Sequence, residues 1–103
     1  MSFYDLLKKA EQGDIISSLE LAKNYYSGRG VKKDLIEAIK WFNIAAEDGS
    51  GEAEYYLANC YYFGFGVEKN YKKALDFFLR AKKHYYMDCS SMISDCIEEL
   101  KLI

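Results

Sequence analysis

A stretch of seven residues recurs almost unchanged 36 positions further along this chain. YYSGRGV occupies positions 25–31, and YYFGFGV occupies positions 61–67. When residues 13–48 are aligned with residues 49–84, twelve of the 36 positions are identical, whereas about two would match by chance. A period of this length is typical of helical solenoids, in which each unit is one pair of helices. The repeat therefore constrains the fold more than any other feature of the sequence.

Each unit has the pattern of two amphipathic helices joined by a glycine turn. In the first unit, apolar residues recur at helical spacing over positions 15–26, and the glycines then interrupt them. Asp34 with Glu37 three residues later has the form of a capping box, which predicts the start of a second helix. Ser50 and Asn70 are the corresponding cap candidates in the second unit.

The two ends of the chain read as half units. Residues 1–12 match the end of a second helix, and residues 85–103 match a first helix. We therefore predict a single all-α domain, an α-solenoid of two complete repeats (13–48 and 49–84) flanked by single capping helices.

The residues LAKNYYSGRGVKKDLIEAIKWFNIAAEDG match a known pattern: Leu-Ala-x-x-Tyr, a Gly-x-Gly-Val turn, a capping Asp, then Ala-x-x-Trp-Phe. This pattern resembles the Sel-1-like repeat, a relative of the tetratricopeptide repeat, over residues 13–84 and the half unit at each end. The resemblance implies a module that binds other proteins as an adaptor, a scaffold or a secretion-related partner. Some secreted members with a cysteine pair in each unit were described as β-lactam hydrolases, and a small hydrolase of that type is the alternative function. This chain lacks the cysteine pairs.

Composition and charge exclude several other functions. The net charge of −2 and a pI near 5.4 argue against nucleic acid as a partner. No stretch approaches the roughly 20 apolar residues of a membrane span, and the N-terminus lacks a signal-peptide pattern. The cysteines, Cys60, Cys89 and Cys96, form no C-x-x-C pair, so we expect reduced, mostly buried thiols and a cytoplasmic protein.

Nothing in the sequence assembles a catalytic or cofactor site. The two Gly-x-Gly turns have helices on both sides and no following Lys-Ser/Thr, so we expect them to be inter-helix turns, not phosphate loops. His84 is the only histidine, and it falls at a predicted helix end, where a surface position is expected. We expect no enzyme activity, no metal and no cofactor.

Adjacent tyrosines on the first helix of the second unit are the strongest candidates for a partner-binding site. The buried face of that helix is set by Ala53, Leu57 and Tyr61. At 100° per residue, Tyr55, Tyr56 and Asn59 point elsewhere, and we expect them in a concave groove lined by first helices. Exposed tyrosines there are typical of an interaction hot spot, with Lys23 and Asp95 at the edges. The alternative is that both rings pack on neighbouring side chains.

The C-terminal end of the chain carries two further features. Asp88, Asp95 and Glu99 are spaced to form an acidic stripe on the last helix, which favours a basic partner or is an ordinary solvated face. A basic toxin neutralised by an immunity protein is one such partner, and an adaptor role is the other. The last helix has no following helix to cover it, so we expect Cys96, Leu100, Leu102 and Ile103 to form an apolar end. This end would either form a homodimer interface or fold back on the chain.

Overall fold

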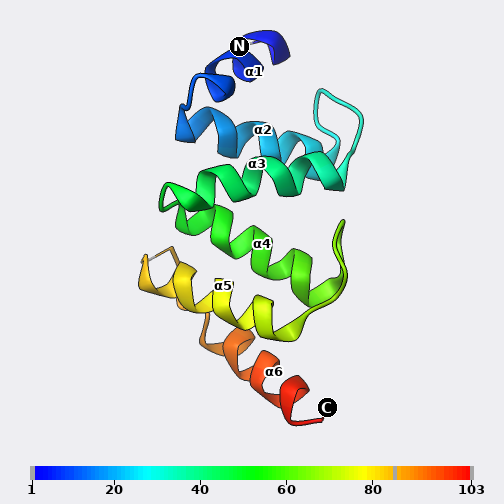
Figure 1. Cartoon of the computed structure of the whole chain (residues 1–103), viewed down its shortest axis with the longest axis vertical. Helices are drawn as coiled ribbons and strands as arrows, with labels where there is room; N and C mark the ends of the chain where they lie inside the picture. The colour runs from blue at the N-terminus through cyan, green and yellow to red at the C-terminus, as the bar shows by residue number, and fades with distance from the viewer. Residues whose placement is uncertain (1, 85, 103) are drawn as a thin grey trace.

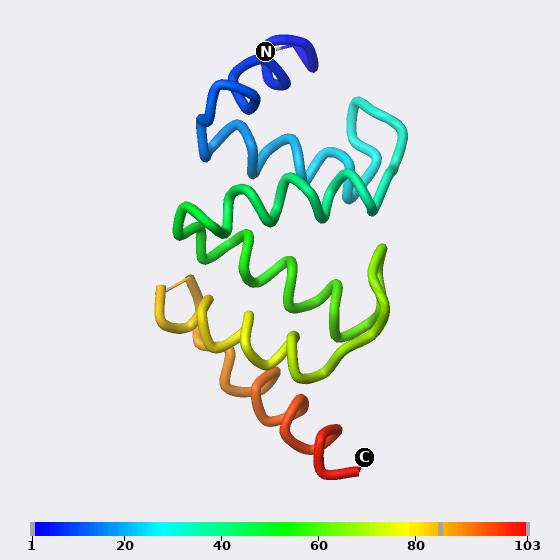
Figure 2. The backbone as a smooth tube through the Cα atoms, viewed as in Figure 1, coloured from blue at the N-terminus to red at the C-terminus, as the bar shows by residue number. Residues whose placement is uncertain are grey.

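The computed structural model describes residues 2–84 and 86–102, in which six helices are stacked one after another (Figures 1 and 2). They are α1 (Phe3–Glu11), α2 (Ile15–Ser27), α3 (Leu35–Glu47), α4 (Gly51–Phe63), α5 (Tyr71–Lys83) and α6 (Ser90–Lys101). Each helix packs mainly on the helix before it and the helix after it, and the stack measures 45 × 26 × 16 Å. There is no strand in the described part of the chain. The predicted α-solenoid is confirmed.

Side-chain caps fix where the helices of both repeats begin. Asp14, Asp34, Ser50 and Asn70 each accept a hydrogen bond from the backbone N–H three residues on, at 3.0–3.1 Å. The three caps predicted from the sequence are therefore confirmed. The expected capping box is only half formed, because the Glu37 carboxylate accepts from the Trp41 indole at 3.2 Å instead of reaching back to the cap.

The two glycine turns end the first helix of each repeat. Gly28 and Gly64 are the C-caps of α2 and α4, with φ of 76° and 77°, a left-handed conformation that favours glycine. Gly66 has a second role, since a Cβ added there would lie 2.8 Å from the Cβ of Leu35. The second turn therefore packs against the start of α3 in the preceding repeat, and only a glycine leaves room for this approach.

The core runs the length of the stack, and α4 contributes to both halves of it. Leu57 packs in a cluster with the N-terminal helices, whereas Ala58 belongs to a cluster with α5 and α6. Phe42 and Phe78, at equivalent positions of the two repeats, are fully buried. Burial of each phenylalanine stabilises the fold by about 2–3 kcal/mol. The predicted core position of Leu57 is confirmed, and α4 is enclosed from two sides.

The last helix begins later than its sequence pattern predicts. α6 starts at Ser90, so Asp88 precedes the helix and is not part of a helical acidic stripe; it accepts from the Ser90 hydroxyl instead. Asp95 remains exposed on α6. Cys96 is buried in this chain's own core, so it does not contribute to an apolar end, and Ile103 lies outside the described residues.

Candidate functional site

Two neighbouring hollows mark the face formed by the first helices α2, α4 and α6. The N-terminal hollow has a volume of about 680 Å³ and is lined by Glu20, Lys23, Asn24, Tyr26, Ser27, Arg29 and Tyr56. The C-terminal hollow has a volume of about 70 Å³ and is lined by Asn59, Tyr62, Phe63, Phe78, Met92 and Asp95. Four of the five predicted site residues thus line a hollow, two in each. Tyr55 lines neither of them.

The adjacent tyrosines are more buried than the sequence predicts. The Tyr56 ring stacks on Phe42, with ring centres 4.9 Å apart and planes 10° apart, and it meets the edge of Tyr26 at 5.3 Å. The Tyr55 ring meets Phe78 at 6.0 Å and Tyr86 at 5.5 Å. Both tyrosines are half-buried, so the expectation that they are exposed is wrong.

The physical reason is that α4 lies between α3 and α5. A ring that points away from one neighbouring helix therefore meets the other: Tyr56 packs on Phe42 of α3, and Tyr55 packs on Phe78 of α5. Most of the surface of Tyr55 and Tyr56 is therefore packed on neighbouring side chains, as the alternative interpretation of the sequence predicts. Replacing either with alanine would remove core contacts together with any binding contact.

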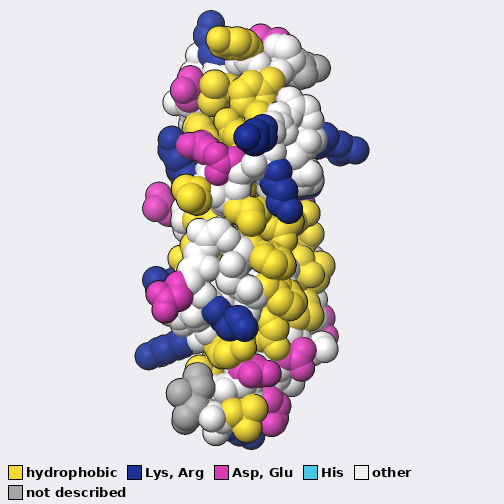
Figure 3. All heavy atoms as spheres, turned by 90° about the vertical axis from the view of Figure 1, so that its right-hand side faces the viewer, with side chains coloured by type: hydrophobic (Ala, Val, Ile, Leu, Met, Phe, Trp, Pro, Cys, Tyr) yellow, Lys and Arg dark blue, Asp and Glu magenta, His cyan; other side chains and the backbone are white. Residues whose placement is uncertain are grey.

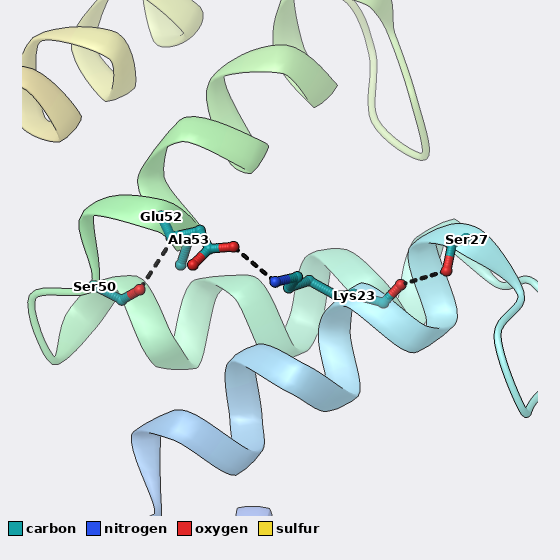
Figure 4. A network of polar contacts seen from close by, with 5 residues as sticks. All are labelled: Lys23, Ser27, Ser50, Glu52 and Ala53. Carbon is teal, nitrogen blue, oxygen red and sulfur yellow. Dashed lines mark hydrogen bonds and ion pairs between the residues drawn. The ribbon is translucent and has the colours of Figure 1, made fainter. Parts of the chain in front are cut away.

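An ion pair joins the first helices of the two repeats beside the N-terminal hollow (Figure 4). The Lys23 Nζ lies 2.8 Å from a carboxylate oxygen of Glu52, and both side chains remain about one-third exposed. The hydrogen bond that Lys23 donates to the Glu52 carboxylate raises the pKa of the Lys23 ammonium. Such a partly exposed pair contributes roughly 0–1 kcal/mol of stability. Its main effect is to fix the position of the Lys23 cation at the edge of the hollow.

A contact between a buried glutamate and a histidine was not predicted from the sequence. Glu54 is 2% exposed, and its carboxylate lies 2.6 Å from Nδ1 of His84 at the end of α5. The imidazole is 40% exposed, so the surface position expected for His84 is right, but its partner was not foreseen. The available signal was a glutamate in the first turn of α4, directly after Ala53 of the buried face, because a buried carboxylate needs a partner.

The thiols and the turns have the properties of structural elements. Burial raises the pKa of the Cys60 thiol to about 12 and that of the Cys96 thiol to about 11, which keeps both in the unreactive thiol form near neutral pH. The glycine turns follow the C-terminal ends of α2 and α4, whose negative dipole ends repel phosphate.

Within residues 2–84 and 86–102, no three His, Cys, Asp or Glu side chains gather as metal ligands would. In the same part of the chain, every helix is too short or too polar to cross a bilayer.

These features define the class of the protein as a helical repeat protein whose neighbouring units stack into a solenoid. A family model of the Sel1 repeat matches residues 16–50 and again residues 51–86, so the chain belongs to the Sel1 repeat family. Proteins of this family generally mediate protein–protein interactions.

Solved structures show the same architecture. The chain is 39% identical to a Sel1 repeat protein from Oxalobacter formigenes, with a TM-score of 0.73 over 77% of this chain and 32% of that one. It is 32% identical to c5321, a protective antigen of uropathogenic Escherichia coli with an SLR fold, with a TM-score of 0.75 over 95% of this chain and 21% of that one. The chain thus spans a third or less of these proteins. No curated protein gives a significant match.

Proposed function

We propose that this chain is a non-catalytic module that binds a protein or peptide partner along the face formed by α2, α4 and α6. The observation that carries the proposal is the pair of hollows in a row on this face, each lined by aromatic rings together with polar groups. Partner contacts are assigned to Tyr55, Tyr56, Asn59, Lys23 and Asp95. Aromatic side chains with polar neighbours are typical of protein interfaces.

The repeat itself arranges three different polar groups along this face. Lys23, Asn59 and Asp95 are spaced by 36 residues, so they occupy the same position in three successive first helices. Along the stack they present a cation, an amide and a carboxylate. A partner segment with the complementary order of charges would bind in one direction only, because the reversed segment would place like charges together.

Two biological roles fit such a module: an adaptor, or an immunity protein that binds and neutralises a basic toxin. Both would act in the cytoplasm, an assignment supported by three free thiols. A homodimer through α6 and its C-cap is a second candidate assembly, because Ile97 on α6 and Leu102 at the C-cap are 41% and 80% exposed. Light scattering of the purified chain distinguishes the homodimer from a monomer.

Co-purification from the native host tests the proposed surface. One variant replaces Lys23, Asn59 and Asp95 with alanine, and a control variant replaces the exposed Lys40 and Asp76 on the second helices. We expect a partner, identified by mass spectrometry, that is lost with the first variant and kept with the control. Equal recovery of that partner with both variants would show that the binding surface lies elsewhere.

A further inference from the structure

The two repeats differ sharply at their glycine turns, although the turns have the same backbone. The first repeat has Ser27 and Arg29 at the positions where the second has Phe63 and Phe65. The two glycines of each turn have φ between 71° and 77°. Since the first turn forms with a serine and an arginine, turn geometry does not require the phenylalanines.

The two phenylalanines form an exposed aromatic pair. Their rings stack with centres 5.3 Å apart and planes 20° apart, and Phe63 and Phe65 remain 54% and 39% exposed. Tyr62 meets the edge of Phe63 at 4.9 Å and that of Tyr71 at 5.3 Å. Figure 3 shows the side of the molecule with the turns, where hydrophobic side chains run through the middle and lower parts and acidic side chains border the lower end. Contiguous exposed apolar surface of this kind marks interaction sites.

This aromatic pair adjoins the C-terminal hollow, which is apolar inside and acidic at its rim. Phe63, Phe78 and Met92 supply apolar walls, and Asp95 supplies a carboxylate. Neither lysine nor arginine is among the described residues that line it. Burial raises the pKa of the Tyr62 phenol, which also lines the hollow, and the negative charges of Glu99 and Asp95 raise that pKa further.

We propose that the C-terminal hollow and the Phe63–Phe65 pair bind one aliphatic or aromatic side chain of a partner segment that carries Lys or Arg beside it. This inference rests on the proposed function and names the chemistry of its partner. The apolar side chain would be buried against Phe63 and Phe78, and the cation would meet Asp95. An apolar anchor in a small pocket, with a charged group at the rim, is the usual form of a binding hot spot.

The N-terminal hollow carries charges of both signs, and this difference sets the direction of the bound segment. Lys23 and Arg29 line it together with Glu20, and Lys23 is paired with Glu52, so a basic side chain gains less there than beside Asp95. The basic part of a partner therefore lies toward α6.

The first repeat supplies the variant that tests the aromatic pair. Phe63→Ser with Phe65→Arg introduces the residues that the equivalent turn already carries, so the turn is expected to fold. Asp95→Asn removes the rim charge. Leu79→Ser is the matched control, because Leu79 is 47% exposed on α5 and does not line the hollow.

Three synthetic twelve-residue peptides serve as probes, identical except for a central Leu-Arg, Ser-Arg or Leu-Glu pair. Binding is followed by NMR through the Met92 methyl group and the Asn59 side-chain amide, which both line the hollow. We expect the Leu-Arg peptide to bind about tenfold or more tightly than the other two. The double phenylalanine variant and Asp95→Asn should each weaken that binding severalfold, and Leu79→Ser should not.

Each other outcome overturns the inference. Equal binding of the Ser-Arg peptide would exclude the apolar anchor, and equal binding of the Leu-Glu peptide would exclude the cation preference. Shifts confined to Lys23 and Tyr56 would place the segment in the N-terminal hollow, which contradicts the inference and leaves the proposed function standing. If no peptide shifts either set of signals, the inference is wrong, and the co-purification experiment judges the proposed function separately.

Discussion

Because Glu54 contacts His84, we expect replacement of His84 to lower the stability of the protein. His84→Ala removes the imidazole whose Nδ1 lies 2.6 Å from the Glu54 carboxylate, and Glu54 is 2% exposed. The variant leaves a buried acceptor without its partner at the junction of α4 and the end of α5. The cost is therefore set by burial of Glu54, not by the small apolar area of His84.

The size of the effect follows from the desolvation of the carboxylate. An unsatisfied buried hydrogen-bonding group costs about 1–3 kcal/mol, and more when it is charged. Water can enter partly, since His84 is 40% exposed, so we expect about 1–2 kcal/mol. For a domain of this size, the melting temperature should fall by roughly 4–16 °C.

Thermal unfolding followed by circular dichroism measures this change, with Lys83→Ala as the control on the same exposed turn. In a Glu54→Gln background, His84→Ala should cost much less, because the charge has been removed from the buried site. If His84→Ala destabilises the protein no more than Lys83→Ala, or if its cost is unchanged in the Glu54→Gln background, then the buried Glu54 charge does not depend on His84.

Three further predictions concern the turns, the core and the thiols. Gly66→Ala should lower the melting temperature more than Gly30→Ala. Both glycines have positive φ, but only at Gly66 would the new Cβ meet Leu35, at 2.8 Å. Equal losses in the two variants would contradict the packing of the second turn on α3. Leu57→Ala should cost about 2–5 kcal/mol in chemical denaturation, through a cavity in the core. The Cys60 thiol, with its pKa raised to about 12, should stay unreactive toward a disulfide reagent at pH 8 and react once the chain is unfolded, since its thiolate forms only as pH approaches that value.

The sequence by itself determined the architecture, and it did so through local chemistry. The 36-residue period gave the number and order of the helix pairs, and the caps at Asp34, Ser50 and Asn70 lie where their sequence patterns predict. A cap depends on a side chain and a backbone N–H three residues away, and a helix face depends on residues within a few turns. Both are therefore visible in one sequence without knowledge of distant contacts.

Only the tertiary structure decided which surfaces are free. Periodicity shows which face of α4 is most apolar, but not that α3 and α5 enclose the helix and leave Tyr55 and Tyr56 half-buried. The contacts of Lys23 with Glu52 and of Glu54 with His84 join residues 29 and 30 positions apart. Such contacts depend on how neighbouring helices are stacked and rotated, and the spacing of residues within a single helix carries no information about that rotation.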